Sequence, residues 1–76
     1  MVVIEVEAGG VVARHPAGGA QLFTDVLGSG WVSGGDGERQ AITAGETVLW
    51  ESGESHESGS DEGMRVLVVE AESVDV

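Results

Sequence analysis

The sequence predicts an all-β domain, and three of its features lead to that prediction. Apolar and polar residues alternate with a period of two in several short runs, which is typical of half-buried strands. Thirteen glycines against one proline predict many tight turns between these runs. No stretch shows the pattern of a helix. Seven short strands separated by turns suggest a β-sandwich or a β-barrel.

The predicted strands follow one another closely along the chain. The first shows the pattern well, because Val2, Ile4 and Val6 occupy alternate positions. Residues 34–37, with sequence GGDG, are a strong hairpin signal between two later strands. A short helix is the alternative for residues 20–27, but Thr24 and Val26 are poor helix formers. The predicted strands cover residues 2–6, 11–15, 21–27, 31–33, 38–43, 46–50 and 64–71.

Three segments are expected to lie outside strands. Residues 28–30, with sequence GSG, predict a turn, and the polar residues 51–63 predict a loop. Residues 72–76 are expected to be a frayed tail. A chain of 76 residues without an internal repeat or linker makes one domain, over residues 1–76.

The size of the chain and one of its strands predict a homodimer. So short a chain forms only a marginal core of its own. Residues 66–69 are apolar on both faces, so we expect a second sheet or another subunit to cover each face. The strand at residues 2–6 is expected to leave an open sheet edge, where a second copy would also find a surface.

The charge of the chain excludes several classes of partner. Fourteen acidic residues against three arginines give a net charge of −11, which disfavours nucleic acid and anionic membranes. No apolar run approaches the roughly 20 residues of a membrane span. Residues 2–6 are too short for a signal peptide, and the chain has no cysteine, so we expect a cytoplasmic location.

Two sets of residues have the spacing of a known pair of motifs. The first set is Gly9, His15, Ala17, Gln21 and Gly28, and the second is Gly45, Glu51, Gly53, His56 and Ser60. In order and spacing the two sets resemble the two motifs of the cupin family, and the chain looks closest to small single-domain bacterial cupins. The resemblance covers residues 9–60. It implies a minimal cupin-like β-barrel, of the jelly-roll type, with its ligands lining the interior.

The resemblance also implies which side chains form the site. His15 and His56 match two of the three metal histidines of the family, whereas Ala17 replaces the third and Gln21 replaces its glutamate. Because Zn, Fe, Mn and Ni sites usually need three protein donors, the sequence leaves open whether a divalent metal binds. In a metal-free pocket, His15, Gln21 and His56 would instead hydrogen-bond a small polar ligand. In either case we expect the two imidazoles to face each other across the mouth of one cavity, with Gln21 between them.

Two further residues are candidates for this pocket. If Gln21 points inward, alternation also points Phe23, Asp25 and Leu27 inward, and Asp25 could supply the missing anionic metal ligand. A bulge or another register would leave Asp25 in solvent. Trp50, on the strand that leads to His56, either walls the pocket or belongs to the core. The candidate ligand-binding residues are therefore His15, Gln21, His56 and Trp50, and the candidate metal ligands are His15, His56, Gln21 and Asp25.

Three functions compete at this point. The first is a cupin-type binding protein for a small molecule or a divalent metal, with no assured catalysis. The second is a metal-dependent cupin enzyme, such as a dioxygenase or an isomerase, with His15 and His56 as ligands. The third is a structural or interaction protein with a vestigial pocket. The missing histidine weighs against the enzyme, and the retention of His15, Gln21 and His56 weighs against a vestigial pocket.

Overall fold

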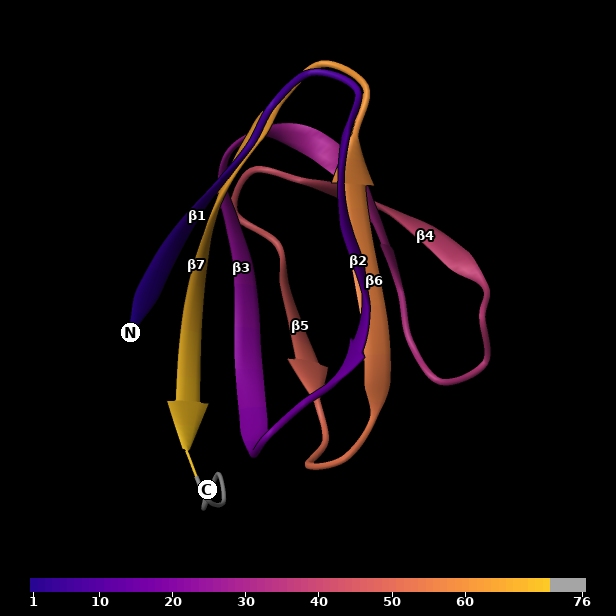
Figure 1. Cartoon of the computed structure of the whole chain (residues 1–76). Helices are drawn as coiled ribbons and strands as arrows, with labels where there is room; N and C mark the ends of the chain where they lie inside the picture. Colours follow the sequence, from indigo (N-terminus) through magenta and orange to yellow (C-terminus); the bar gives the residue numbers. More distant parts are fainter. Residues whose placement is uncertain (72–76) are drawn as a thin grey trace.

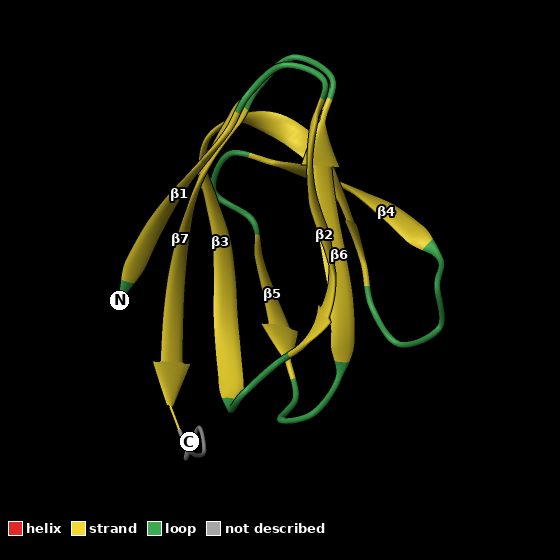
Figure 2. Ribbon diagram, in the orientation of Figure 1, coloured by secondary structure: helices red, strands yellow, loops and turns green. Residues whose placement is uncertain are grey.

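The computed structural model describes residues 1–71, which form seven strands and no helix (Figures 1 and 2). Most of the predicted strands are found with ends shifted by a residue or so, and the predicted tail at 72–76 lies outside the described residues. No helix in residues 1–71 is long and apolar enough to cross a membrane. The strands are β1 (Val2–Val6), β2 (Gly10–Pro16), β3 (Ala20–Ser33), β4 (Arg39–Thr43), β5 (Thr47–Trp50), β6 (Ser55–Ser60) and β7 (Met64–Ala71).

The strands form two antiparallel sheets that share one long strand. The first sheet has the order β1-β7-β3-β5 and uses the first half of β3. The second has the order β2-β6-β3-β4 and uses the second half of β3. Figure 1 shows β1, β7 and β3 on one side of the molecule and β2, β6 and β4 on the other. The hydrophobic core lies between the two sheets.

The predicted turn at residues 28–30 is wrong, because β3 runs through this segment without reversing. Gly28 has a φ of 82°, a conformation that favours glycine, and it bends the strand from one sheet into the other. A Cβ at this position would lie 2.3 Å from the carbonyl oxygen of Gly63, so the bend needs glycine for space as well. The glycines therefore turn a corner inside one strand rather than joining two.

The predicted loop at residues 51–63 is also wrong in its centre, where β6 forms. This strand reads as polar, yet Ser58 and Ser60 are buried and β6 lies between β2 and β3. Small residues are needed there, since a Cβ at Gly59 would lie 2.6 Å from the Trp31 ring. The buried Ser60 hydroxyl accepts a hydrogen bond from the Gly63 amide over 2.7 Å. Backbone pairing and close packing thus make a strand from residues of low strand propensity.

Side chains from both sheets build one core. Along β7, Val66 and Val68 point inward and are buried, whereas Leu67 is half-buried and Val69 is 40% exposed on the outer face. The second sheet covers the inner face of β7, and the outer face stays open within residues 1–71. The buried apolar residues are Val6, Ala17, Phe23, Val32, Ile42, Trp50, Met64, Val66 and Val68.

Candidate functional site

His15 on β2 and His56 on β6 lie directly opposite each other in the strand register, and their ring centroids are 4.4 Å apart. A β-bulge between Val12 and His15 brings them together. Val12 faces the interior, so regular alternation would turn Arg14 inward and His15 outward; the extra residue of the bulge reverses this. The two imidazoles therefore lie together at one cavity, as expected, but their rings are too close for Gln21 to lie between them. Nothing in the sequence indicated the bulge.

The His15 ring lies at the exposed rim of the site. Its Nδ1 is 2.8 Å from the carbonyl oxygen of Ala13, two residues earlier. A carbonyl only accepts hydrogen bonds, so Nδ1 carries the proton. In the neutral ring, Nε2 is then an unprotonated acceptor that is left for a ligand.

The His56 ring is buried between two aromatic neighbours. It is 4% exposed, and its centroid lies 5.1 Å from that of Trp50 on the side away from water. Burial lowers the pKa of His56, and the positive charges of His15 and Arg14 lower it further, against an opposing effect of Glu54. The Nε2 atom of His56 is buried and has no hydrogen-bond partner among the described residues. A neutral imidazole with an unpartnered nitrogen thus forms part of the wall.

Gln21 on β3 points into the same space and is 9% exposed. Its Nε2 donates to the Glu70 carboxylate over 3.2 Å, from the residue directly opposite on β7. Sequence reasoning missed Glu70. Its position along the strand could have identified it, because Glu70 has the same parity as the inward-facing Val66 and Val68 on β7.

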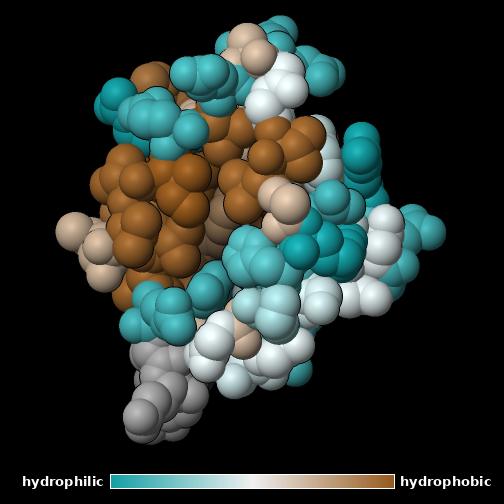
Figure 3. Space-filling view, viewed as in Figure 1, coloured by the Kyte–Doolittle hydropathy of each residue, from teal (hydrophilic) through white to brown (hydrophobic). Residues whose placement is uncertain are grey.

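These side chains line a cavity of about 160 Å³ between the two sheets. One part of the wall is apolar and the other is polar, so the cavity suits an amphipathic molecule. Figure 3 shows hydrophobic side chains gathered over β1 and β7, two of the strands that border the cavity. The apolar lining is Val2, Ile4, Val12, Phe23 and Val68, and the polar lining is His15, Gln21, His56, Ser58 and Glu70.

Asp25 faces the interior but does not join the histidines. It is fully buried on β3, four residues beyond Gln21, and it does not line the cavity. Its Oδ1 accepts a hydrogen bond from the Leu27 amide over 3.1 Å, and its Oδ2 has no partner in the part of the chain that the structure describes. Burial raises the pKa of Asp25, the Leu27 amide lowers it, and the charge of Glu46 raises it. Leu27, expected inside, is 58% exposed because a bulge follows Asp25.

Trp50 lies behind His56 and does not line this cavity. Its ring is 5% exposed, packs against Phe23 at 6.4 Å, and borders a separate cavity of about 260 Å³ beside the β3–β4 hairpin. The sequence left open whether Trp50 walls the pocket or belongs to the core. The structure places it in the core, where its ring packs against that of His56.

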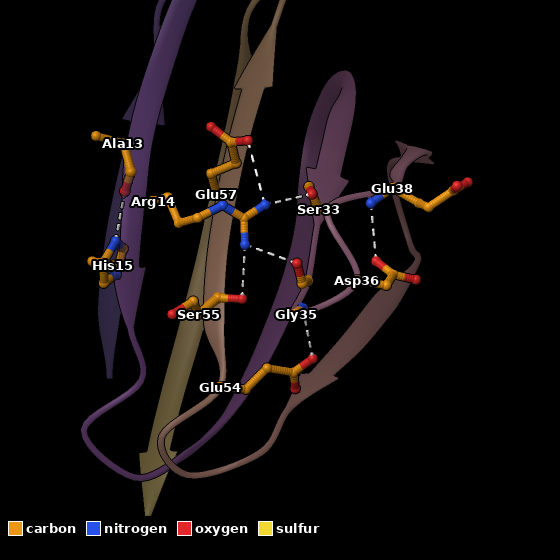
Figure 4. A network of polar contacts seen from close by, with 11 residues as sticks. Ala13, Arg14, His15, Ser33, Gly35, Asp36, Glu38, Glu54, Ser55 and Glu57 are labelled. Atoms are coloured by element: carbon orange, nitrogen blue, oxygen red, sulfur yellow. Dashed lines mark hydrogen bonds and ion pairs between the residues drawn. The ribbon is translucent and has the colours of Figure 1, made fainter.

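On the outer face of the second sheet, Arg14 joins its edge strand β2 to β6 and to the end of β3 (Figure 4). Its guanidinium donates to the Gly34 carbonyl over 2.8 Å and to the buried Ser33 hydroxyl over 2.7 Å. It also reaches the Ser55 carbonyl at 3.2 Å and the Glu57 carboxylate at 3.4 Å. Because Glu57 and His56 are consecutive on β6, Arg14 lies on the opposite face of the sheet from the cavity.

The two-sheet arrangement matches solved structures. A cupin superfamily protein from Desulfitobacterium hafniense superposes with a TM-score of 0.85 at 11% identity, over 93% of this chain and 64% of its own. The chain has the cupin fold. A protein of unknown function from Streptococcus pyogenes gives a TM-score of 0.84 at 22% identity, over 96% of this chain and 63% of its own.

A third similar structure is a predicted oxalate decarboxylase from Thermotoga maritima. Its TM-score is 0.78 at 25% identity, over 87% of this chain and 59% of its own. The chain thus spans less than two thirds of the length of each of these three proteins. No protein-family model and no curated protein matches its sequence.

The side chains around the cavity do not fit a metal that needs three protein donors. Residues 1–71 contain no group of three His, Cys, Asp or Glu side chains placed to hold an ion. Ala17 offers no donor at the position of the third family histidine, and Asp25 lies elsewhere on β3. Gln21 directs its amide nitrogen to Glu70. Two imidazoles remain, fewer donors than such sites commonly use.

Proposed function

We propose that this chain is a binding protein whose inter-sheet cavity takes a small organic molecule without a resident metal. The observation that carries the proposal is the pair of imidazoles in the wall of a cavity with an apolar side, where neither the His15 Nε2 nor the buried His56 Nε2 has a hydrogen-bond partner within residues 1–71. A buried polar atom without a partner is costly, and a ligand that hydrogen-bonds it recovers part of that cost.

The size of the cavity limits its ligand. A cavity of roughly 150 Å³ accommodates benzene, and this one has about 160 Å³. We therefore expect a ligand of benzene-like size, with a short apolar body against Val2, Ile4 and Phe23 and a polar head toward His15 and His56. The same polar wall could serve a reaction, but a metal-dependent reaction would need donors that the described residues do not bring together.

Ligand-observed NMR with a library of fragments of this size tests the proposal, using two matched variants. Val2→Trp adds bulk to a residue that lines the cavity, whereas Val11→Trp adds the same bulk to a similarly exposed valine away from it. We expect fragments to bind the wild type and Val11→Trp alike, and to lose about tenfold or more in affinity with Val2→Trp. Equal binding by both variants, or no binding to the wild type, would contradict the proposal.

A divalent-metal titration separates this proposal from the metal-binding alternative. With zinc or manganese added to chelator-treated protein, we expect no stoichiometric binding that depends on His15 and His56 together. Tight binding that both His15→Ala and His56→Ala abolish would favour the metal site instead.

A further inference from the structure

The one carboxylate among the residues that line the cavity belongs to Glu70, an exposed residue, and no arginine lines it. Glu70 contributes a carboxylate to its wall, and its Oε2 accepts only the Gln21 amide among the described hydrogen bonds. At His56, the negative charge of Glu54 opposes the positive charge of Arg14 on the other face of the sheet. His15 and His56 add acceptor nitrogens when their rings are neutral. The polar side of the cavity is therefore rich in acceptors and carries negative charge.

Every arginine of the chain is engaged away from this cavity. Arg14 bonds to Ser33 and Glu57 on the opposite face of the second sheet. Arg39 stacks on the Trp31 ring at 3.8 Å, and Arg65 pairs with Glu5. The chain has no lysine, and the remaining cation, the amino group of Met1, belongs to a residue that is 86% exposed and does not line the cavity.

From this distribution we infer that the cavity selects a small organic ammonium ion, with one protonated amine on an apolar body of benzene-like size. This inference rests on the proposed binding function and specifies its ligand class. The ammonium group donates hydrogen bonds to the Glu70 carboxylate and to the His15 Nε2, and the apolar body contacts the valine and phenylalanine wall. A carboxylate of the same size would meet Glu70 without a compensating cation.

Three ligands of nearly equal shape test the inference: n-butylammonium, 1-butanol and butyrate. Affinities are measured at pH 8 and low salt by NMR titration of the wild-type chain. We expect butylammonium to bind about tenfold more tightly than butanol, since a hydrogen bond to a charged group is stronger than a neutral one, and butyrate to bind most weakly. Butyrate binding as tightly as butylammonium would overturn the inference while leaving the binding function intact. No binding by any of the three would overturn both.

Two variants that each remove one negative charge test whether Glu70 itself attracts the ammonium group. Glu70→Gln removes the carboxylate from the cavity wall, and Glu7→Gln removes one negative charge from an exposed residue outside it. We expect Glu70→Gln to reduce butylammonium affinity about tenfold with little change for butanol, and Glu7→Gln to change neither. Equal losses in the two variants would show that the overall negative charge, and not Glu70, attracts the ligand, and would overturn the assignment.

Discussion

Arg14 and Ser33 hydrogen-bond across β6, and this contact joins the edge strand β2 to the buried end of β3. The Ser33 side chain is fully buried, and the same guanidinium holds the Gly34 carbonyl at the start of the hairpin. Arg14 is therefore part of the scaffold that holds His15 opposite His56, although it lies on the other face of the sheet.

Removal of the Arg14 guanidinium is expected to destabilise the fold. Arg14→Met leaves a buried hydroxyl and a carbonyl without their donor, which should cost about 2–3 kcal/mol of unfolding free energy. Arg39→Met is the matched control, because Arg39 only stacks on Trp31 at the surface, and it should cost about 1 kcal/mol or less. Urea unfolding of both variants measures the difference, and equal losses would contradict the role given to Arg14.

The lowered pKa of His56 predicts that the fold weakens in acid. Above about pH 6.5, the ordinary histidine value, the ring is neutral in both the folded and unfolded chain and contributes no pH dependence. Below it, the unfolded chain takes up a proton that the buried ring resists, so stability falls until the pH passes the folded pKa.

Urea unfolding between pH 8 and pH 5 of the wild type and of His56→Phe measures this effect. Phenylalanine keeps a ring against Trp50 and cannot titrate, so the variant should lose less stability over this range. A variant with the same pH slope as the wild type would show that His56 is not responsible.

Asp25 should act in the opposite sense. Its pKa is raised in the folded chain, so the carboxyl contributes no penalty below the ordinary aspartate value and an increasing penalty as the pH rises through the folded pKa. Asp25→Asn cannot ionise, so between pH 4 and pH 7 its stability relative to the wild type should improve with pH until the folded pKa of Asp25 is passed, and then level off. The sign of this slope is the prediction, because a buried amide adds its own pH-independent cost. A flat difference over that range would contradict the burial of an ionisable Asp25.

The homodimer predicted from the sequence has a candidate surface on the outer face of the first sheet. Val69, Leu22 and Leu49 are register partners across β7, β3 and β5, and Val3 and Leu67 continue the apolar row on β1 and β7. Val69, Leu49 and Val3 are between 40% and 56% exposed. Two copies stacked through this apolar row, which lies beside the Glu5–Arg65 ion pair, would bury it, as packed sheets do.

Sedimentation velocity at micromolar concentration tests the dimer. We expect the wild type and Val11→Lys to sediment as dimers and Leu49→Lys as a monomer, since both variants add one charge to an exposed apolar residue but only Leu49 lies on this face. A monomeric wild type at these concentrations would end the prediction.

The sequence could predict the strands whose own residues have a strand pattern. The prediction failed for segments that form a strand only because of tertiary contacts. Alternation identified β1, and an apolar run identified β7. β6 could not be found in this way, since its serines and glycine form a strand only between β2 and β3 and beneath Trp31. The turn expected at Gly28 failed for a related reason, because a glycine that bends a strand and one that ends it look alike in sequence.

The positions of the two histidines in the site could be predicted from the sequence better than those of the other side chains. Motif spacing identified His15, Gln21 and His56, but the bulge before His15 and the bulge after Asp25 each reverse the parity of a strand, and neither is visible in the sequence. Glu70 could have been identified by its parity on β7, and was missed because no motif includes it.

We expect a small organic molecule to bind in the cavity beside the two imidazoles, without a metal. The most direct measurement is an NMR titration of chelator-treated protein with butylammonium, in which the His15 and His56 ring protons are followed. We predict that both sets of signals shift together on one saturable curve, and that added chelator leaves the affinity unchanged. Unshifted histidine signals, or binding that is lost with chelator and restored by zinc, would contradict the claim.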